Sequence, residues 1–127
     1  MTSLKRLIII EDELQILQLY QLKFELEGFE VHTARDGREG LRLIKETKPD
    51  LVLLDLRMPH MSGDEMLAKL QAADWGADVH VAILTNLSRT EAPASLRFLG
   101  VERYIVKANH TPAQVVAIVR EILGLSR

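Results

Sequence analysis

Short runs of aliphatic residues alternate along the chain with longer segments whose apolar residues recur at helical spacing. The clearest run, Leu51-Val52-Leu53-Leu54, ends at Asp55. An uninterrupted apolar run of this length is typical of a strand buried on both faces, as in a parallel sheet. The whole pattern predicts strands at 4–10, 29–33, 51–55, 79–84 and 103–106, and helices at 14–27, 37–46, 64–73, 90–99 and 112–123.

Local signals at the helix ends agree with this division. Gly28 follows the first helix, where a left-handed residue commonly ends the turn. Asp36 is expected to cap the second helix, and Thr111-Pro112-Ala113-Gln114 has the form of a helix start with Thr111 as N-cap. Pro93 is expected in the first turn of the fourth helix, where its missing N–H is harmless.

Five strands that strictly alternate with five helices define an α/β fold. Connections of helix length imply parallel strands, right-handed crossovers and helices on both faces. We therefore predict a doubly wound five-stranded parallel sheet of order 2-1-3-4-5, with ligands at the switch point between the first and third strands. The length of 127 residues suits one domain, 1–127.

The composition narrows the class of protein. Apolar residues make up 47% and charged residues 27%, as in globular domains, and the net charge of −2 offers no basic field for nucleic acid. The sequence has no Cys, no apolar run long enough to span a membrane and no signal peptide. A cytoplasmic location without membrane contact is expected.

Chemically active side chains follow four of the predicted strands. Glu11 and Asp12 follow the first and Asp55 the third, while Thr85 and Lys107 end the fourth and fifth. Carboxylates crowded at one sheet edge repel one another unless a cation lies among them. An all-oxygen ligand set suits Mg²⁺.

This group of side chains supports phosphoryl transfer. An ionised Asp55 can act as a nucleophile without a general base, because aspartate is an established covalent phosphoryl carrier. Lys107, the Thr85 hydroxyl and Mg²⁺ would neutralise the phosphoryl oxygens. Each residue also has a plainer interpretation: Glu11 and Asp12 as helix caps, Asp55 as a loop cap, and Thr85 as a strand-end hydrogen bonder.

These residues closely resemble the receiver domain of bacterial two-component response regulators. The resemblance covers Lys5 to about Leu123, and its motifs are Glu11-Asp12, Asp55-x-x-Met58-Pro59-x-x-x-Gly63, Thr85 and Tyr104-x-x-Lys107. The spacings of 43, 30 and 22 residues between Asp12, Asp55, Thr85 and Lys107 match as well. The predicted fold is the flavodoxin-like (βα)5 fold of that family.

The resemblance implies a role for each residue. Asp55 would accept phosphate from a histidine kinase or histidine phosphotransfer protein. Mg²⁺ would be held by Glu11, Asp12, Asp55 and the backbone carbonyl of Arg57. Lys107 would pair with the phosphoryl oxygens.

The resemblance also implies a switch and an output. Thr85 and Tyr104 would move together and remodel the face formed by 90–99, 103–106 and 112–123, which a downstream protein would read. The domain itself would contact no nucleic acid. Transfer and hydrolysis would be autocatalysed on its own Asp55, so the chain would not be an enzyme acting on other molecules.

Two residues depart from the family pattern. Ala108 stands where Pro usually follows the lysine, so we expect a trans peptide bond and a different hold on Lys107. Asn86 replaces the usual Ala or Gly after the threonine, where it would narrow access to Asp55 or bond the phosphoryl group. Arg57, two residues after Asp55, could shield the site from an attacking water. We therefore expect phosphorylation or dephosphorylation rates that differ from those of typical family members.

Several alternatives stay open. The same fold can act as a pseudo-receiver, a phosphorylation-independent interaction module. A haloacid-dehalogenase-like phosphatase would want a second Asp at position 57, and a dinucleotide-binding protein would want a Gly-rich turn after the first strand. The first helix carries more apolar residues than one inward stripe needs, so its outer face is a hypothetical phosphodonor contact. The chain could be a stand-alone regulator, or a fragment of a longer protein with a DNA-binding or enzymatic output domain.

Overall fold

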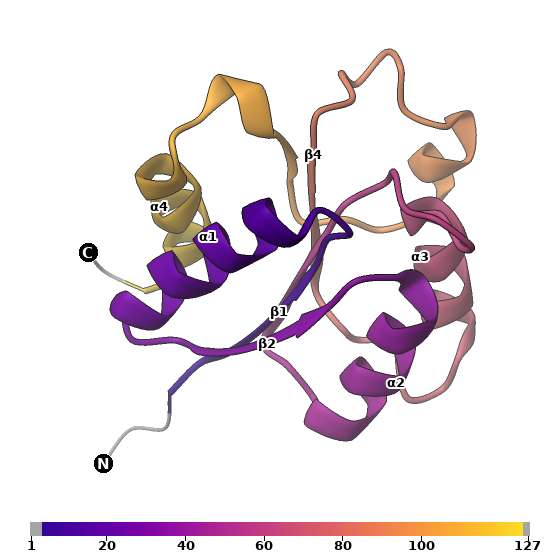
Figure 1. Cartoon of the computed structure of the whole chain (residues 1–127). Coiled ribbons are helices and arrows are strands. Elements are labelled where there is room, and N and C mark those ends of the chain that lie inside the picture. Colours follow the sequence, from indigo (N-terminus) through magenta and orange to yellow (C-terminus); the bar gives the residue numbers. More distant parts are fainter. Residues whose placement is uncertain (1–3, 126–127) are drawn as a thin grey trace.

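The computed structural model describes residues 4–125, in which five parallel strands form one sheet (Figure 1). The strand order is β2-β1-β3-β4-β5, as predicted. The strands are β1 (Arg6–Ile10), β2 (Glu30–Ala34), β3 (Leu51–Leu54), β4 (Val81–Thr85) and β5 (Tyr104–Val106). Because all five run in one direction, their carboxyl ends meet at one edge of the sheet.

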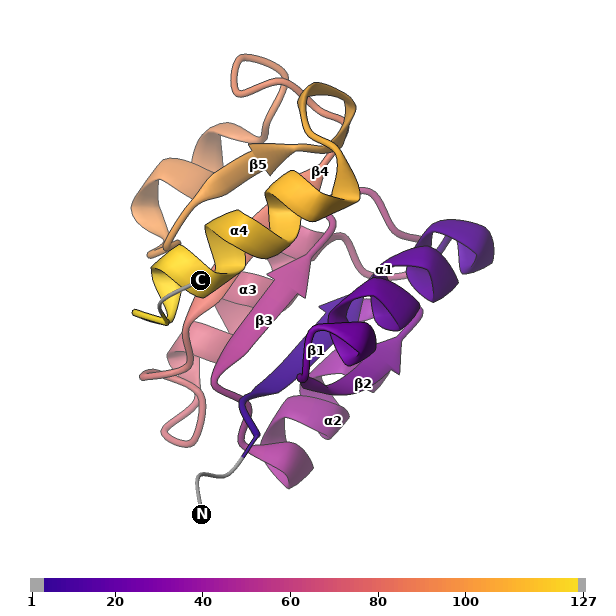
Figure 2. The same ribbon diagram turned by 90° about the vertical axis from the view of Figure 1, so that its left-hand side faces the viewer.

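Helices cover both faces of the sheet. The α-helices are α1 (Leu14–Leu26), α2 (Gly37–Thr47), α3 (Gly63–Ala72) and α4 (Pro112–Ile122), and short 3₁₀ helices occupy η1 (Ala94–Phe98) and η2 (Lys107–Asn109). In Figure 2, α1 and α4 lie in front of the sheet and α3 lies behind it. The described chain has no helix with the length and apolar character that crossing a bilayer requires.

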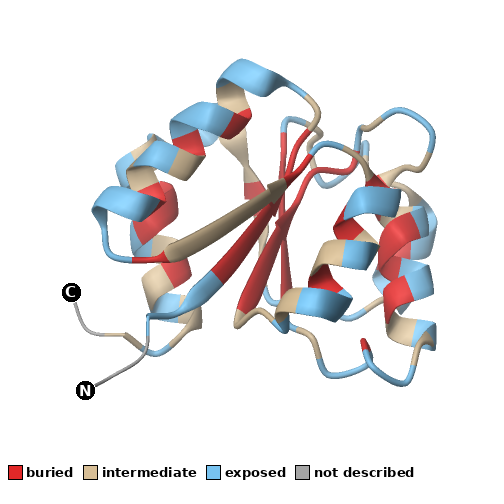
Figure 3. Cartoon of the chain, turned by 60° about the horizontal axis from the view of Figure 1, so that its bottom comes forward, coloured by how far each residue is buried: buried red, intermediate tan, exposed pale blue. Residues whose placement is uncertain are grey.

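The core is divided into two layers by the sheet. In β1, Leu7 and Ile9 pack on the side of α1 and α4, whereas Ile8 and Ile10 pack on the side of α2 and α3. All four residues of β3 are buried, as predicted for a strand covered on both faces. Figure 3 shows the buried strands between the two helical layers. The apolar run before Asp55 therefore fixes the carboxylate at the sheet edge.

The predicted α-helix at 90–99 is wrong. Only the 3₁₀ helix η1 is present there, and Pro93 is its N-cap rather than a first-turn residue. The preceding residues are held in a separate turn, since Ser88 N–H donates to Glu91 Oε1 at 2.8 Å. Such local side-chain bonds compete with helix formation, and a proline cannot continue a helix from the residues before it. The other predicted elements begin and end within two residues of the observed ones.

The predicted helix caps are confirmed. Asp36 Oδ1 accepts from the N–H of Glu39 at 2.8 Å, at the start of α2. Thr111 and Gln114 form a reciprocal capping box at the start of α4, with Pro112 in the first turn. Gly28, after α1, has a φ of +93°, a left-handed value that suits glycine. These signals set where α1 ends and where α2 and α4 begin.

Replacing Thr111 with alanine should lower the free energy of unfolding by about 1 kcal/mol, because an N-terminal amide of α4 loses its acceptor. Urea denaturation of the purified protein measures this loss. Thr111→Ser, which keeps a capping hydroxyl, should retain most of the stability. Equal stability of the alanine variant and the parent would show that the capping box contributes nothing.

Candidate functional site

Three carboxylates gather where β1 and β3 end. β1 pairs directly with β3, and the pairing of Ile10 with Leu54 brings the residues that follow them together. Glu11, Asp12 and Asp55 each offer an oxygen within 4.8 Å of the others. Glu11 and Asp55 are buried, and Asp12 is half-buried. The structure thus brings together the acidic residues that the sequence predicts as a metal site.

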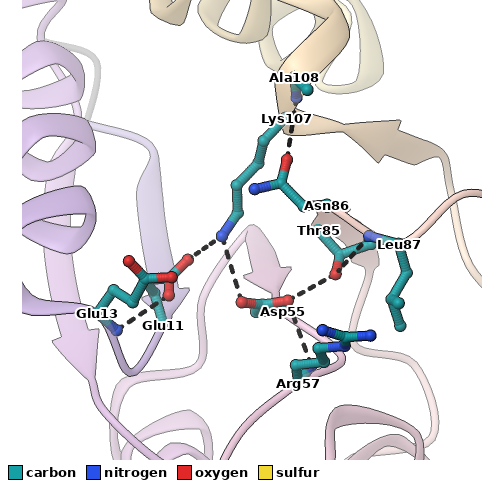
Figure 4. A network of polar contacts seen from close by, with 9 residues as sticks. All are labelled: Glu11, Glu13, Asp55, Arg57, Thr85, Asn86, Leu87, Lys107 and Ala108. Carbon is teal, nitrogen blue, oxygen red and sulfur yellow. Dashed lines mark hydrogen bonds and ion pairs between the residues drawn. The ribbon is translucent and has the colours of Figure 1, made fainter.

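Lys107 reaches the carboxylates from the end of β5, at the first residue of η2 (Figure 4). Its Nζ donates to Glu11 Oε1 and, at 3.2 Å, to Asp55 Oδ2. Burial lowers the pKa of Lys107, but the hydrogen bond that it donates to Glu11 and the charges of Asp55 and Glu11 outweigh this effect and raise the pKa above its ordinary value. The two neighbouring carboxylates therefore favour the charged form of Lys107 inside the site.

Burial also acts on Glu11. Burial raises its pKa above the ordinary value, against the opposing effects of Lys107 and of the hydrogen bond from the Glu13 backbone N–H. Lys107 contacts Glu11 and Asp55, and Asp12 lies beside them, so three ionised carboxylates would outnumber the contacting lysine. A further cation would relieve this repulsion.

Asp55 is held in place by donors on both oxygens. Oδ1 accepts from the Thr85 hydroxyl at 2.7 Å and from the backbone N–H of Arg57 at 3.3 Å, whereas Oδ2 faces Lys107. The strand-end threonine therefore contacts Asp55, as its position in the sequence indicates. The carboxylate has one orientation relative to the lysine, which suits a positioned nucleophile.

Gly63 allows the chain after β3 to fold back over Asp55. A Cβ at this position would lie 2.2 Å from the carbonyl oxygen of Asp55 and 2.8 Å from the Cα of Leu56. The N–H of Gly63 also donates to the carbonyl of Leu56 at 2.9 Å. The first residue of α3 is thus in backbone contact with the residue that carries the candidate nucleophile.

Tyr104 lies apart from the carboxylates, at the start of β5. Its hydroxyl donates to the carbonyl of Leu87 at 2.8 Å, and the guanidinium of Arg89 lies 5.3 Å from its ring centroid. Burial raises the pKa of Tyr104. The tyrosine therefore anchors the loop that follows Thr85, which is where a coupled movement of the two residues would act.

The two departures from the family pattern contact one another. Asn86 Oδ1 accepts from the backbone N–H of Ala108 at 3.1 Å. The residues from 4 to 125 contain no cis peptide bond, so the expected trans bond after Lys107 is confirmed. This contact was missed by sequence reasoning, although both residues adjoin predicted site residues. The Arg57 side chain is exposed, and only its backbone N–H contacts Asp55.

The donor set fits a hard divalent cation. All three side chains offer carboxylate oxygens, which suit Mg²⁺ better than softer metals, and the half-buried Asp12 leaves one side accessible to water. Magnesium usually keeps several waters and takes one or two carboxylates. The backbone carbonyl of Arg57 stays a prediction as a further ligand.

The family model and the similar proteins found by comparison all point to one family. A family model described as the response regulator receiver domain matches residues 7–120. The transcriptional regulatory protein PrrA of Mycobacterium leprae is 35% identical over 121 residues, covering 95% of this chain and 51% of its own length. The cell cycle transcriptional regulator CtrA of Caulobacter vibrioides is 34% identical over 122 residues, covering 94% of this chain and 52% of its own length. The chain thus spans about half the length of these relatives.

Solved structures agree. A CheY-like response regulator receiver domain protein from Methanospirillum hungatei JF-1 superposes with a TM-score of 0.86 at 30% identity, over 96% of this chain and 95% of that one. The chemotaxis response regulator CheY4 of Vibrio cholerae gives a TM-score of 0.85 at 22% identity, over 94% of this chain and 99% of that one. The second likeness concerns the fold alone.

Proposed function

Because this chain belongs to the response regulator receiver domain family of two-component systems, we propose that it is a phosphoryl-accepting switch whose acceptor is Asp55. The observation that carries this proposal is the arrangement around that carboxylate. Thr85 and the Arg57 N–H fix one oxygen, Lys107 faces the other, and two more carboxylates lie beside it. A buried carboxylate in this setting combines a positioned nucleophile with charge neutralisation.

The proposed step is an attack of an Asp55 carboxylate oxygen on the phosphorus of a partner phosphohistidine. A P–O bond forms while the P–N bond breaks, and the electron pair stays on the imidazole nitrogen, which binds a proton. Lys107 would shift its ammonium from the carboxylates to the phosphoryl oxygens, and the Thr85 hydroxyl would donate to another. Water would then attack the phosphorus of the acyl phosphate, the bond between the phosphorus and the Asp55 oxygen would break, and inorganic phosphate would leave with the Asp55 carboxylate restored.

A magnesium ion would assist at this site by offsetting the charge of the carboxylates and the phosphoryl group. Glu11, Asp12 and Asp55 would hold it together with the backbone carbonyl of Arg57. The excess of carboxylate over lysine charge supports this assignment. The reaction would be autocatalysed on the chain's own aspartate, so we propose no enzymatic action on other molecules.

The proposed partners are a histidine kinase or histidine phosphotransfer protein and a downstream protein, all in the cytoplasm, with no nucleic-acid or membrane contact by this domain. Leu14, Leu19, Leu22 and Leu26 are 45–74% exposed on α1. Their exposure supports the phosphodonor contact suggested by the surplus of apolar residues in this helix. Residues 1–127 would form one receiver domain, and its output through η1, β5 and α4 is part of this proposal.

Intact-mass spectrometry after incubation with acetyl phosphate and Mg²⁺ tests the proposed function. The wild-type protein should gain one phosphoryl group, and Asp55→Asn should gain none because its amide is no nucleophile. Chelation of Mg²⁺ with EDTA should slow the labelling strongly. A wild-type protein that is unmodified by acetyl phosphate and by beryllofluoride would instead favour the pseudo-receiver, a phosphorylation-independent interaction module.

A further inference from the structure

Asn86 and Ala108 join the ends of β4 and β5 beyond the last pair of the sheet. The pairing of these strands ends with Thr85 opposite Val106. The Asn86 side chain then accepts from the N–H of Ala108 at 3.1 Å, as Figure 4 shows. This side-chain bond continues the connection where the backbone ladder stops. Its two residues directly follow Thr85, the last residue of β4, and Lys107, the first residue of η2.

The bond needs a side-chain acceptor at position 86 and any residue other than proline at position 108. Ala108 lies in the first turn of η2, where backbone N–H groups have no partner within the helix. A proline at 108 would have no N–H to donate, and an alanine at 86 would offer no side-chain oxygen. The two residues that depart from the family pattern, Asn86 and Ala108, therefore supply the acceptor and the donor of one hydrogen bond.

The bond also bears on the placement of Lys107. Its side chain ends on Glu11 and Asp55, and its backbone lies between paired Val106 and bonded Ala108. On the far side of the turn, the N–H of His110 donates to the Lys107 carbonyl at 3.2 Å. The Asn86 bond thus fixes the turn at the residue that directly follows Lys107.

We propose that Asn86 is a positioning residue for Lys107, acting through the Ala108 N–H. In the family pattern a rigid proline follows the lysine; here the hydrogen bond between Asn86 and Ala108 would take over its role of constraining the turn. This inference rests on the proposed function of Asp55. Both Asn86 and Ala108 are exposed, so water can solvate the freed groups when the bond is removed. Overall stability should therefore stay nearly unchanged. Lys107 should move nevertheless, because the backbone directly after it loses its anchor.

The experiment deletes each partner separately. Asn86→Ala removes the acceptor, and replacing Ala108 with lactic acid puts an ester oxygen in place of the donor N–H. Each change should slow acetyl phosphate labelling of Asp55 about fivefold, because a displaced Lys107 stabilises the transferring phosphoryl group less well; this is a small part of the roughly 10²-fold that misplacing a group by about 1 Å can cost. Both changes together should slow it no further, since they remove the same bond. The urea midpoint should not move.

Ala108→Gly is the matched control, because it keeps the N–H and should be labelled at close to the wild-type rate. Amide hydrogen exchange gives an independent readout: the Ala108 amide should exchange faster in Asn86→Ala than in the wild type. Additive rate effects, or an Ala108 amide unaffected by Asn86→Ala, would overturn the inference. An unlabelled wild type would contradict the proposed function, whereas the exchange measurement would still decide whether Asn86 holds Ala108.

Discussion

Replacing Lys107 with methionine is expected to slow phosphoryl labelling of Asp55 by about 10²–10³-fold, the usual effect of removing one preorganised group that stabilises charge in a transition state. It should also lower the free energy of unfolding by about 3 kcal/mol in the absence of Mg²⁺. Lys107 contacts Glu11 and Asp55, and both carboxylates are buried. Without the lysine, two buried negative charges have no cation.

Conditions that neutralise the carboxylates should reverse the loss of stability. Mg²⁺ should restore part of it in urea denaturation, because a bound cation takes over the lysine charge. A lower pH should also restore part of it. Burial raises the pKa of Glu11, so the folded variant binds a proton that the unfolded chain releases more readily, and this stability is lost as pH rises through the folded pKa.

The control for this experiment is Lys69→Met on the exposed side of α3. Surface substitutions of this kind usually change stability by less than about 0.5 kcal/mol. Labelling of Asp55 in this control should match that of the wild type. A Lys107→Met protein that matches the control in both measurements would show that the contacts between Lys107 and the two carboxylates have no energetic role.

Replacing Gly63 with alanine is the second large effect we expect, with a loss of about 4 kcal/mol or failure to fold. The added Cβ would lie 2.2 Å from the carbonyl oxygen of Asp55, and backbone cannot rotate away as a side chain can. The strand end must then move, and Asp55 moves with it. Urea denaturation and the rate of acetyl phosphate labelling measure the two consequences.

Gly28→Ala provides the comparison for this change. Gly28 has a φ of +93° and no heavy atom within 4 Å of an added Cβ, so only the backbone preference opposes alanine. That preference is about 1–2 kcal/mol, and labelling of Asp55 should be unaffected. Equal losses at the two glycines would mean that the close approach to Asp55 is relieved without displacing the strand end.

The strands and most of the site follow from local patterns in the sequence. Uninterrupted aliphatic runs identify the buried strands, and parallel strands necessarily bring Glu11, Asp55 and Thr85 to one edge. The segment 90–99 has helical spacing of its apolar residues, but the Ser88–Glu91 turn and Pro93 prevent an α-helix there. Leu96 is the only buried residue of η1, so little packing favours a helix there.

Contacts within loops were harder to predict than strand ends. Asn86 and Ala108 each stood out in the sequence, but their contact depends on the path of the turn after β5. The pairing of Lys107 with Glu11 was not anticipated either, because the lysine was assigned to the phosphoryl group alone. Side-chain partners across four strand ends are set by three-dimensional positions that no local pattern encodes.

The two helices that flank β5, η1 and α4, differ in how firmly they are held. On one side, η1 is closed by single i-to-i+3 bonds such as that from the Leu96 N–H to the Pro93 carbonyl, at 3.0 Å. On the other, α4 has a full capping box and buries Val115, Val116 and Val119. A displacement of β5 would therefore deform η1 before it deforms α4, so movement of this strand is expected to be transmitted to the η1 side.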